Sequence, residues 1–121
     1  MSGQERLGAL VYTAWSEARS AHQDCRRDQA SAATPIDVLE QIGDRIVTVS
    51  VASALWDIAV EVGESSGNWT DALQHLQRGA AEILALPRST SLVGTAIWQV
   101  RQTACQAVLT RADEILAAHA N

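Results

Sequence analysis

Segment 35–63 carries the longest apolar repeat of this chain, and that repeat restricts the fold more than any other sequence feature. Its apolar residues recur at alternating steps of three and four, the spacing that aligns side chains on one face of an α-helix. Thr34 suits the N-cap and Pro35 the first helical position, so we expect the helix to begin there. The repeat comprises Leu39, Ile42, Ile46, Val49, Ser53, Trp56 and Val60.

Two positions of this repeat need comment. Ile46 to Val51 also fits a β-strand, because β-branched residues alternate with polar ones there. The helical spacing on both sides of this stretch favours the helix. Ser53 is the one polar member of the repeat, and we expect its hydroxyl to bond back to the carbonyl one turn earlier.

A second apolar stripe runs beside the repeat, so segment 35–63 is hydrophobic around most of its circumference. A helix of this kind is normally buried on nearly all sides. Either it packs against its two-fold mate in an isologous homodimer, or it occupies the centre of the monomer. We favour the homodimer, with an interface formed by Val47, Val51, Leu55, Ile58 and Val62.

Three further helices follow from the same spacing rule, at about residues 3–29, 69–86 and 90–119. Small residues such as Ala14 and Ala18 occupy the inward stripe of the first, so a neighbouring helix can approach it closely. With 121 residues the chain is long enough for one core. We therefore expect a single all-α domain spanning residues 1–121. Its architecture is an antiparallel bundle of three long helices and one short helix, similar to a four-helix bundle.

The short third helix creates a mismatch of lengths. If it ran back along the second helix, the final helix would overshoot the bundle by several turns. One solution lays the short helix across the bundle end, so that the final helix runs antiparallel to segment 35–63. In the other solution, a second protomer covers the overhang.

Four tryptophans, in a chain with one tyrosine and no phenylalanine, are the most distinctive feature of the composition. An antiparallel final helix would bring Trp98 close to Trp56, near the end at which Trp69 opens the short helix. These rings are either bulky core residues or the lining of an apolar ligand pocket. The pocket interpretation predicts a site formed by Tyr12, Trp15, Trp56, Trp69, His75, Trp98 and Arg101.

No catalytic or metal-binding motif accompanies these aromatic residues. His22 and Cys25 fall on one helix face, but two ligands do not make a metal site. We expect Cys105 to be a buried, unreactive thiol, and the charged side chains around Arg26 to form a solvated face. The sequence therefore favours a non-enzyme without metal or cofactor. His75 is the one plausible proton carrier under an enzymatic interpretation.

Charge and composition narrow the environment and the partners. The net charge of -5 disfavours nucleic acid, because binding to phosphates requires excess positive charge. All nine basic residues are arginine, which is typical of a GC-rich bacterial or phage genome. The first residues lack an apolar signal region, and Asp57 and Glu61 are among the charges that interrupt the longest apolar stretch. We expect a cytoplasmic protein that does not cross a membrane.

Two classes of function fit these observations. The first is a non-catalytic interaction or accessory protein that acts through the apolar surface of segment 35–63. Such a protein would bind a second copy of itself and, through the same surface, another protein. The alternative is a small-molecule binder or cofactor-free enzyme that takes an apolar ligand into the tryptophan-lined end of the bundle.

Overall fold

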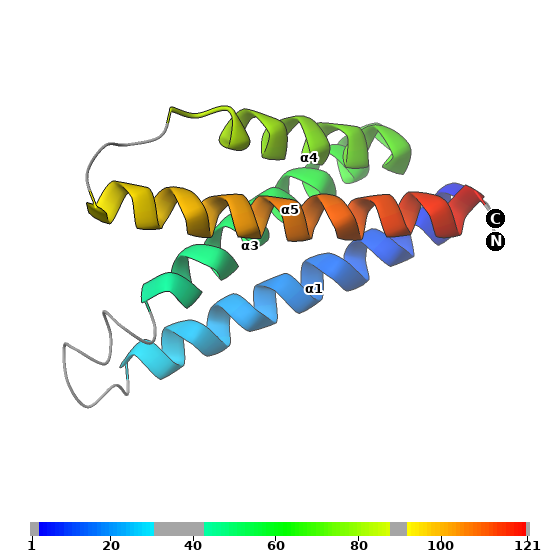
Figure 1. Ribbon diagram of the computed structural model, residues 1–121. Coiled ribbons are helices and arrows are strands. Elements are labelled where there is room, and N and C mark those ends of the chain that lie inside the picture. Colours follow the sequence, from blue (N-terminus) through cyan, green and yellow to red (C-terminus); the bar gives the residue numbers. More distant parts are fainter. Residues whose placement is uncertain (1–2, 31–42, 88–91, 121) are drawn as a thin grey trace.

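A computed structural model describes residues 3–30, 43–87 and 92–120. These residues form the helices α1 (Gly3–Ala30), α3 (Gly43–Ser66), α4 (Trp69–Leu84) and α5 (Leu92–Ala120), shown in Figure 1. This arrangement confirms the expected all-α bundle of three long helices and one short helix. The strand alternative for 46–51 is wrong, because this stretch lies inside α3. The predicted helix starts at 35 and 90 fall outside the described residues.

The helices run alternately up and down, so that α3 and α5 point the same way. A Cβ atom at Gly79 of α4 would lie 3.3 Å from Leu55 of α3, which places α4 alongside α3. Gln77 of α4 donates a hydrogen bond to Asp113 of α5 at 3.0 Å, so α5 follows α4 back along the bundle. Figure 1 shows α4 beside the other helices and not across their end. The arrangement with the short helix across the end is therefore wrong.

One face of each helix contributes to a single core. On α3 the apolar repeat is buried in its C-terminal half, where the helix packs against α1, α4 and α5. Burial of this much aliphatic and aromatic surface is the main force that holds the bundle together. The buried cluster comprises Leu7, Val11, Ala14, Leu55, Trp56, Ala59, Val60, Ala72, Leu73, Leu76, Ala80, Cys105, Val108, Ala112 and Ile115.

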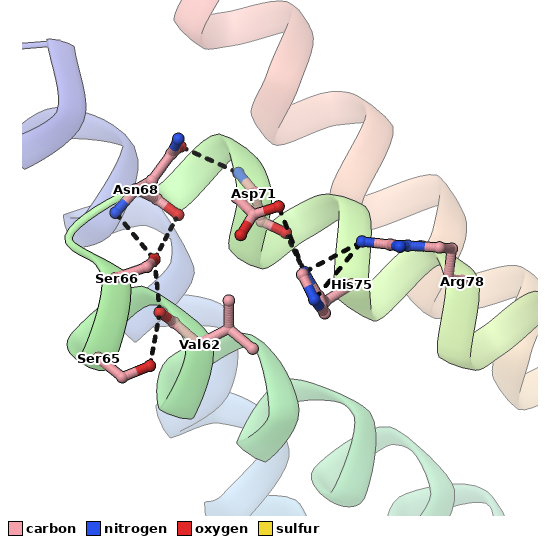
Figure 2. A network of polar contacts seen from close by, with 7 residues as sticks. All are labelled: Val62, Ser65, Ser66, Asn68, Asp71, His75 and Arg78. Atoms are coloured by element: carbon pink, nitrogen blue, oxygen red, sulfur yellow. Dashed lines mark hydrogen bonds and ion pairs between the residues drawn. The ribbon is translucent and has the colours of Figure 1, made fainter.

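The turn between α3 and α4 reverses the chain within two residues. Gly67 has a φ of 69°, a left-handed conformation that glycine adopts without steric cost, and its N–H bonds to the Gly63 carbonyl at 2.9 Å. Asn68 caps α4, because its side-chain oxygen accepts from the Asp71 N–H at 3.1 Å. Figure 2 shows the hydroxyl of Ser66 between Asn68 and the Val62 carbonyl. These bonds fix the direction in which α4 leaves α3.

The first residue of α4 locks this turn against two other helices. The ring of Trp69 occupies the space where side chains at Gly8 of α1 and Gly63 of α3 would lie. A Cβ atom at Gly8 would be 2.6 Å from the indole nitrogen, and one at Gly63 would overlap the six-membered ring. Gln4 of α1 accepts a hydrogen bond from the Trp69 backbone N–H at 2.6 Å. Glycine at both positions is thus required by a close approach between helix backbones and an aromatic ring.

α3 is as apolar in composition as a membrane-spanning helix. By length and composition alone, its segment Arg45–Ser66 is apolar enough to cross a membrane. Asp57 and Glu61 interrupt this segment, as expected, but its overall composition still reaches that of a membrane span. The core helices of helical bundles can have the same length and composition as a membrane span. In this chain α3 packs against three other helices. About one third of the most apolar part of this segment is buried, so much of its surface stays uncovered by this chain.

The Trp69 packing predicts a steric coupling between two positions. Gly63→Ala should lower the free energy of unfolding by about 1–3 kcal/mol, because the added methyl group overlaps the ring. The same substitution should cost much less in a Trp69→Leu background, where the ring is absent. Urea denaturation of the four variants of this double-mutant cycle measures the coupling. Gly79→Ala is the control, because its Cβ atom would lie 3.3 Å from the side chain of Leu55 and would overlap no ring. Equal losses of stability at Gly63 and Gly79 would contradict the packing.

Candidate functional site

Three of the predicted pocket residues come together at the end of the bundle where α3 meets α4. The ring of Tyr12 contacts Trp69 edge-on, with 5.1 Å between centroids, and Trp15 at 6.2 Å. Tyr12 and Trp15 lie one turn apart on α1 and Trp69 opens α4, so the three rings hold α1 against the turn. We refer to Tyr12, Trp15 and Trp69 as the aromatic clamp. Edge-to-face packing of this kind stabilises aromatic pairs by about 0.5–1.5 kcal/mol.

The polar atoms of the clamp bond to α3. The Tyr12 hydroxyl donates to the Glu64 carboxylate, and Trp15 Nε1 donates to Asp57 at 2.6 Å. The hydrogen bond to Glu64, together with smaller effects of desolvation and of the Glu64 charge, raises the pKa of the Tyr12 phenol above its ordinary value. Arg19 lies over the Trp15 ring, 5.2 Å from its centroid. The clamp is therefore a structural tie between α1 and α3.

Trp56 lies away from the clamp, in the middle of the bundle. Only 3% of its surface is exposed, and its ring forms part of the floor of a groove of about 280 Å³ between α1, α3 and α5. The expected close approach of a helix along Ala14 and Ala18 does not fill this space, since both alanines line the groove. Arg111 and Glu17 form an ion pair at its edge, at 3.5 Å.

Trp98 and Arg101 lie toward the opposite end of the bundle. The C-terminal end of α5 meets the start of α1, where a Cβ atom at Gly3 would be 3.0 Å from His119. Trp98 is about 30 Å of helix away from that end, and about 15 Å from the level of Trp56. The expected meeting of Trp98 with Trp56 is wrong, because α5 runs in the same direction as α3. The seven predicted residues therefore do not share one pocket.

His75 belongs to a polar series along α4, which Figure 2 shows. Its Nδ1 lies 2.9 Å from the Asp71 carbonyl oxygen and 3.2 Å from the Arg78 guanidinium. Because Nδ1 can donate to Asp71 or accept from Arg78 but not both, each contact selects a different tautomer. The Asp71 carboxylate lies 3.4 Å from the same nitrogen. These groups bond to one another within a helix, and His75 is half-buried two turns beyond the clamp residue of α4.

Both thiols are buried, in agreement with the expectation for Cys105. Burial raises the pKa of the Cys105 thiol above its ordinary value, and the nearby Arg101 guanidinium opposes this shift more weakly. A thiol with a raised pKa holds little nucleophilic thiolate at neutral pH. In the described parts of the chain, no group of three or more His, Cys, Asp and Glu side chains could hold a metal ion.

The predicted interface residues divide between core and surface. Leu55 is 2% exposed and packs in the core, while Val51 and Val62 are partly buried against it. Ile58 is 38% exposed, and Val47 is half-buried. Leu55 is therefore not available to a partner, whereas Val47, Val51 and Ile58 keep accessible surface. Together with the exposed Ala54 between them, these residues form what we call the outer strip of α3.

A polar cleft between α1 and α3 was not predicted from the sequence. It has a volume of about 370 Å³, and we call it the α1–α3 cleft. We expected the charged side chains around Arg26 to form a solvated face. Arg27 does pair with Asp24 in solvent, but Arg26 lines the cleft. The lining residues are Arg19, His22, Gln23, Arg26, Ser53 and Asp57.

One serine of α3 lines this cleft, Ser53, and a second, Ser50, contacts the lining residue His22. The Ser50 hydroxyl is 3.3 Å from Nε2 of His22, but no described carboxylate bonds to Nδ1 of His22, so the orienting group of a catalytic triad is not found among the described residues. Ser53 is 7% exposed and lines the cleft. The expected bond from its hydroxyl to the carbonyl one turn earlier is not found; neither is a bond to any other described residue. The signal in the sequence was the spacing 19, 22, 23 and 26 on α1, which repeats one helix face.

The bond between Tyr12 and Glu64 makes stability depend on pH. Because the folded pKa of Tyr12 is raised, the bond contributes stability that is complete below the unfolded pKa and is lost as pH rises through the folded pKa. The phenolate absorbance reports Tyr12 alone, since the chain has one tyrosine. Glu64→Gln should lower the measured pKa, while Glu61→Gln should leave it unchanged. An unshifted titration in the Glu64 variant would contradict the bond.

The burial of both cysteines predicts that neither reacts in the folded state. A thiol-specific disulfide reagent should modify Cys25 and Cys105 only at the rate of global or local opening. Both thiols should react at once in concentrated urea, which serves as the positive control. Rapid modification of one thiol in the native protein would show that its helix does not pack as described.

Comparison of the chain with family models, with curated proteins and with solved structures gives no match. Function is therefore inferred from the geometry of this chain alone. That geometry presents an apolar strip on α3, an alanine-lined groove at Trp56 and the polar α1–α3 cleft. The first feature suits a protein surface, and the last suits a small polar molecule.

Proposed function

We propose that this chain is a non-catalytic interaction protein and that it forms a homodimer through the outer strip of α3. The observation that carries the proposal is the 38% exposure of Ile58, on a helix whose buried face already lies in the core. Exposed apolar side chains that adjoin one another on a helix are typical of protein contact surfaces. Binding of another protein through this strip would rest on the same apolar contacts.

The length of α4 explains why the N-terminal part of the strip, at Val47 and Val51, remains uncovered. α4 has 16 residues and α3 has 24, so about 12 Å of α3 extends past its antiparallel neighbour. All seven residues from Ile46 to Ala52 are only partly buried, on every side of the helix. Leu86, which is 45% exposed, follows the end of α4 at about the level of this uncovered half. A second copy is a natural cover for such an overhang.

The strip is self-complementary under a two-fold axis. If two α3 helices pair antiparallel, a register that sets Val47 against Ile58 of the partner subunit also sets Val51 against Ala54 of the partner subunit. The pairing is then reciprocal, as an isologous interface requires. The small side chain of Ala54 lets the two helices approach closely near the axis. Between Val47 and Ile58 the one charged residue of α3 is Asp57, which accepts a hydrogen bond from Trp15 of α1.

The described polar groups support a binding role more than a catalytic one. His75 bonds within α4, and both thiols are buried. The His22 and Ser50 pair has a contact of 3.3 Å but no described orienting group. We place the protein in the cytoplasm of a bacterium. Its arginine-only basic composition and the packing of α3 inside the bundle support this assignment.

The homodimer is tested by measuring mass in solution. Size-exclusion chromatography with light scattering should give about twice the 13.0 kDa of one chain at micromolar concentration. Ile58→Glu should give the monomer, because it places a charge in the apolar contact, against Val47 of the partner subunit. Ala117→Glu, at an exposed site on α5, introduces the same charge and should leave the dimer intact.

Two results would contradict this proposal. One is a wild-type mass of 13.0 kDa at all concentrations measured. The other is unfolding of the Ile58→Glu variant, seen as loss of the helical circular dichroism signal, which would make Ile58 a core residue. A monomeric variant with an unchanged helical spectrum supports the interface.

A further inference from the structure

The α1–α3 cleft gathers polar side chains from one face of each of two helices. Arg19, His22, Gln23 and Arg26 follow one another at steps of three, one and three on α1, so all four point from one side of that helix. The opposite wall comes from α3 and holds Ser53 and Asp57, one turn apart. A volume of about 370 Å³ is the size of a small metabolite.

The cleft is positively charged in an acidic protein. Arg19 and Arg26 form no ion pair with another described residue; the one contact found for their charged ends is that of Arg19 with the Trp15 ring. They face a single carboxylate, that of Asp57, which already accepts a hydrogen bond from Trp15 Nε1 at 2.6 Å. The whole chain has a net charge of -5, so the local charge of the cleft is opposite in sign to that of the protein. Guanidinium groups of this kind are the preferred protein ligands for phosphate.

Ser53 provides a second, independent observation. It is 7% exposed, it lines the cleft, and its hydroxyl has no hydrogen bond to a described residue. The hydroxyl oxygen reaches water through the cleft, since Arg101 Nε is the one fully buried side-chain polar atom without a partner among the described residues. A ligand in the cleft supplies the missing partner.

We infer that the α1–α3 cleft binds a small organic phosphate that carries a hydroxyl group beside the phosphate. Arg19 and Arg26 hold the phosphate oxygens, and the Ser53 hydroxyl donates to one of them. Asp57 accepts from the ligand hydroxyl, which gives its second oxygen a donor. Gln23 and His22 border the same space and contribute further hydrogen bonds. This site lies on the α1 side of α3, and its occupancy does not depend on the homodimer.

Glycerol 3-phosphate is a suitable probe, because it has a phosphate and neighbouring hydroxyls and fits the volume. Binding is followed by two-dimensional NMR of the tryptophan side-chain N–H groups, since Trp15 bonds to Asp57 and stacks with Arg19. The Trp15 resonance, assigned with a Trp15→Phe variant, should shift in a saturable way. Inorganic phosphate should bind more weakly, and glycerol should not bind, because each lacks one of the two groups recognised.

Variants separate this site from general attraction to positive charge. The double variant Arg19→Met, Arg26→Met should weaken binding at least about tenfold, because it removes both charge-assisted contacts and keeps the aliphatic stems. Arg27→Met is the matched control, since Arg27 is adjacent on α1 but pairs with Asp24 in solvent; its affinity should stay within about twofold of wild type. Ser53→Ala should weaken binding without lowering the Tm of the free protein, because the hydroxyl has no partner there.

Three outcomes would overturn the inference. The first is the absence of any saturable shift with glycerol 3-phosphate. The second is a loss of affinity in the Arg27→Met variant equal to that in the Arg19→Met, Arg26→Met variant, which would show that binding depends only on surface charge. The third is a lower Tm of the Ser53→Ala variant without a change in affinity, which would show that the hydroxyl stabilises the fold and does not bind the ligand.

Discussion

The bundle depends on the position of one aromatic ring. Trp69 sits where the Cβ atoms of Gly8 and Gly63 are missing, and so fixes the first turn of α4 against α1 and α3 together. Once α4 starts there, the short turn at Gly67 sends it back along α3, and α5 must then run parallel to α3. The uncovered half of α3 and the position of Trp98 both follow from this single point of contact. Close packing leaves little room for an alternative, since an added methyl group meets the ring directly.

Much of the fold can be read from periodicity. The apolar spacing of segment 35–63 predicts a helix, which the described residues confirm from Gly43 onward, and Trp56 and Val60 of that repeat are buried. Spacing reports which face of a helix turns inward, but it contains no information on the direction of its neighbours. The predicted direction of α5 was therefore wrong, and so was the predicted contact between Trp56 and Trp98. Gly8 and Gly63 carry the missing information, yet a glycine in a helical pattern can equally mark a helix end or an exposed position that no ring approaches.

The candidate sites illustrate the same limit. The sequence singled out the tryptophans, but Trp69 meets Tyr12 of α1 only through helix packing, and Trp56 joins the core instead. The α1–α3 cleft was not predicted, because charged residues at helical spacing have the same pattern whether they face water or another helix. Ser53 was noticed as the polar member of an apolar repeat. Its significance depends on Arg26 lying across from it, which only the packing of α1 on α3 reveals.

The burial of both thiols has a consequence for the covalent chemistry of the chain. Without lysine, the protein offers no side-chain amine for acylation, Schiff-base formation or conjugation. With Cys25 and Cys105 enclosed, it offers no accessible thiol for alkylation or exchange in the folded state. Electrophiles that modify most proteins at these two side chains must enter the core first. The arginines that carry its positive charge retain that charge, since guanidinium groups are neither deprotonated in proteins nor readily acylated.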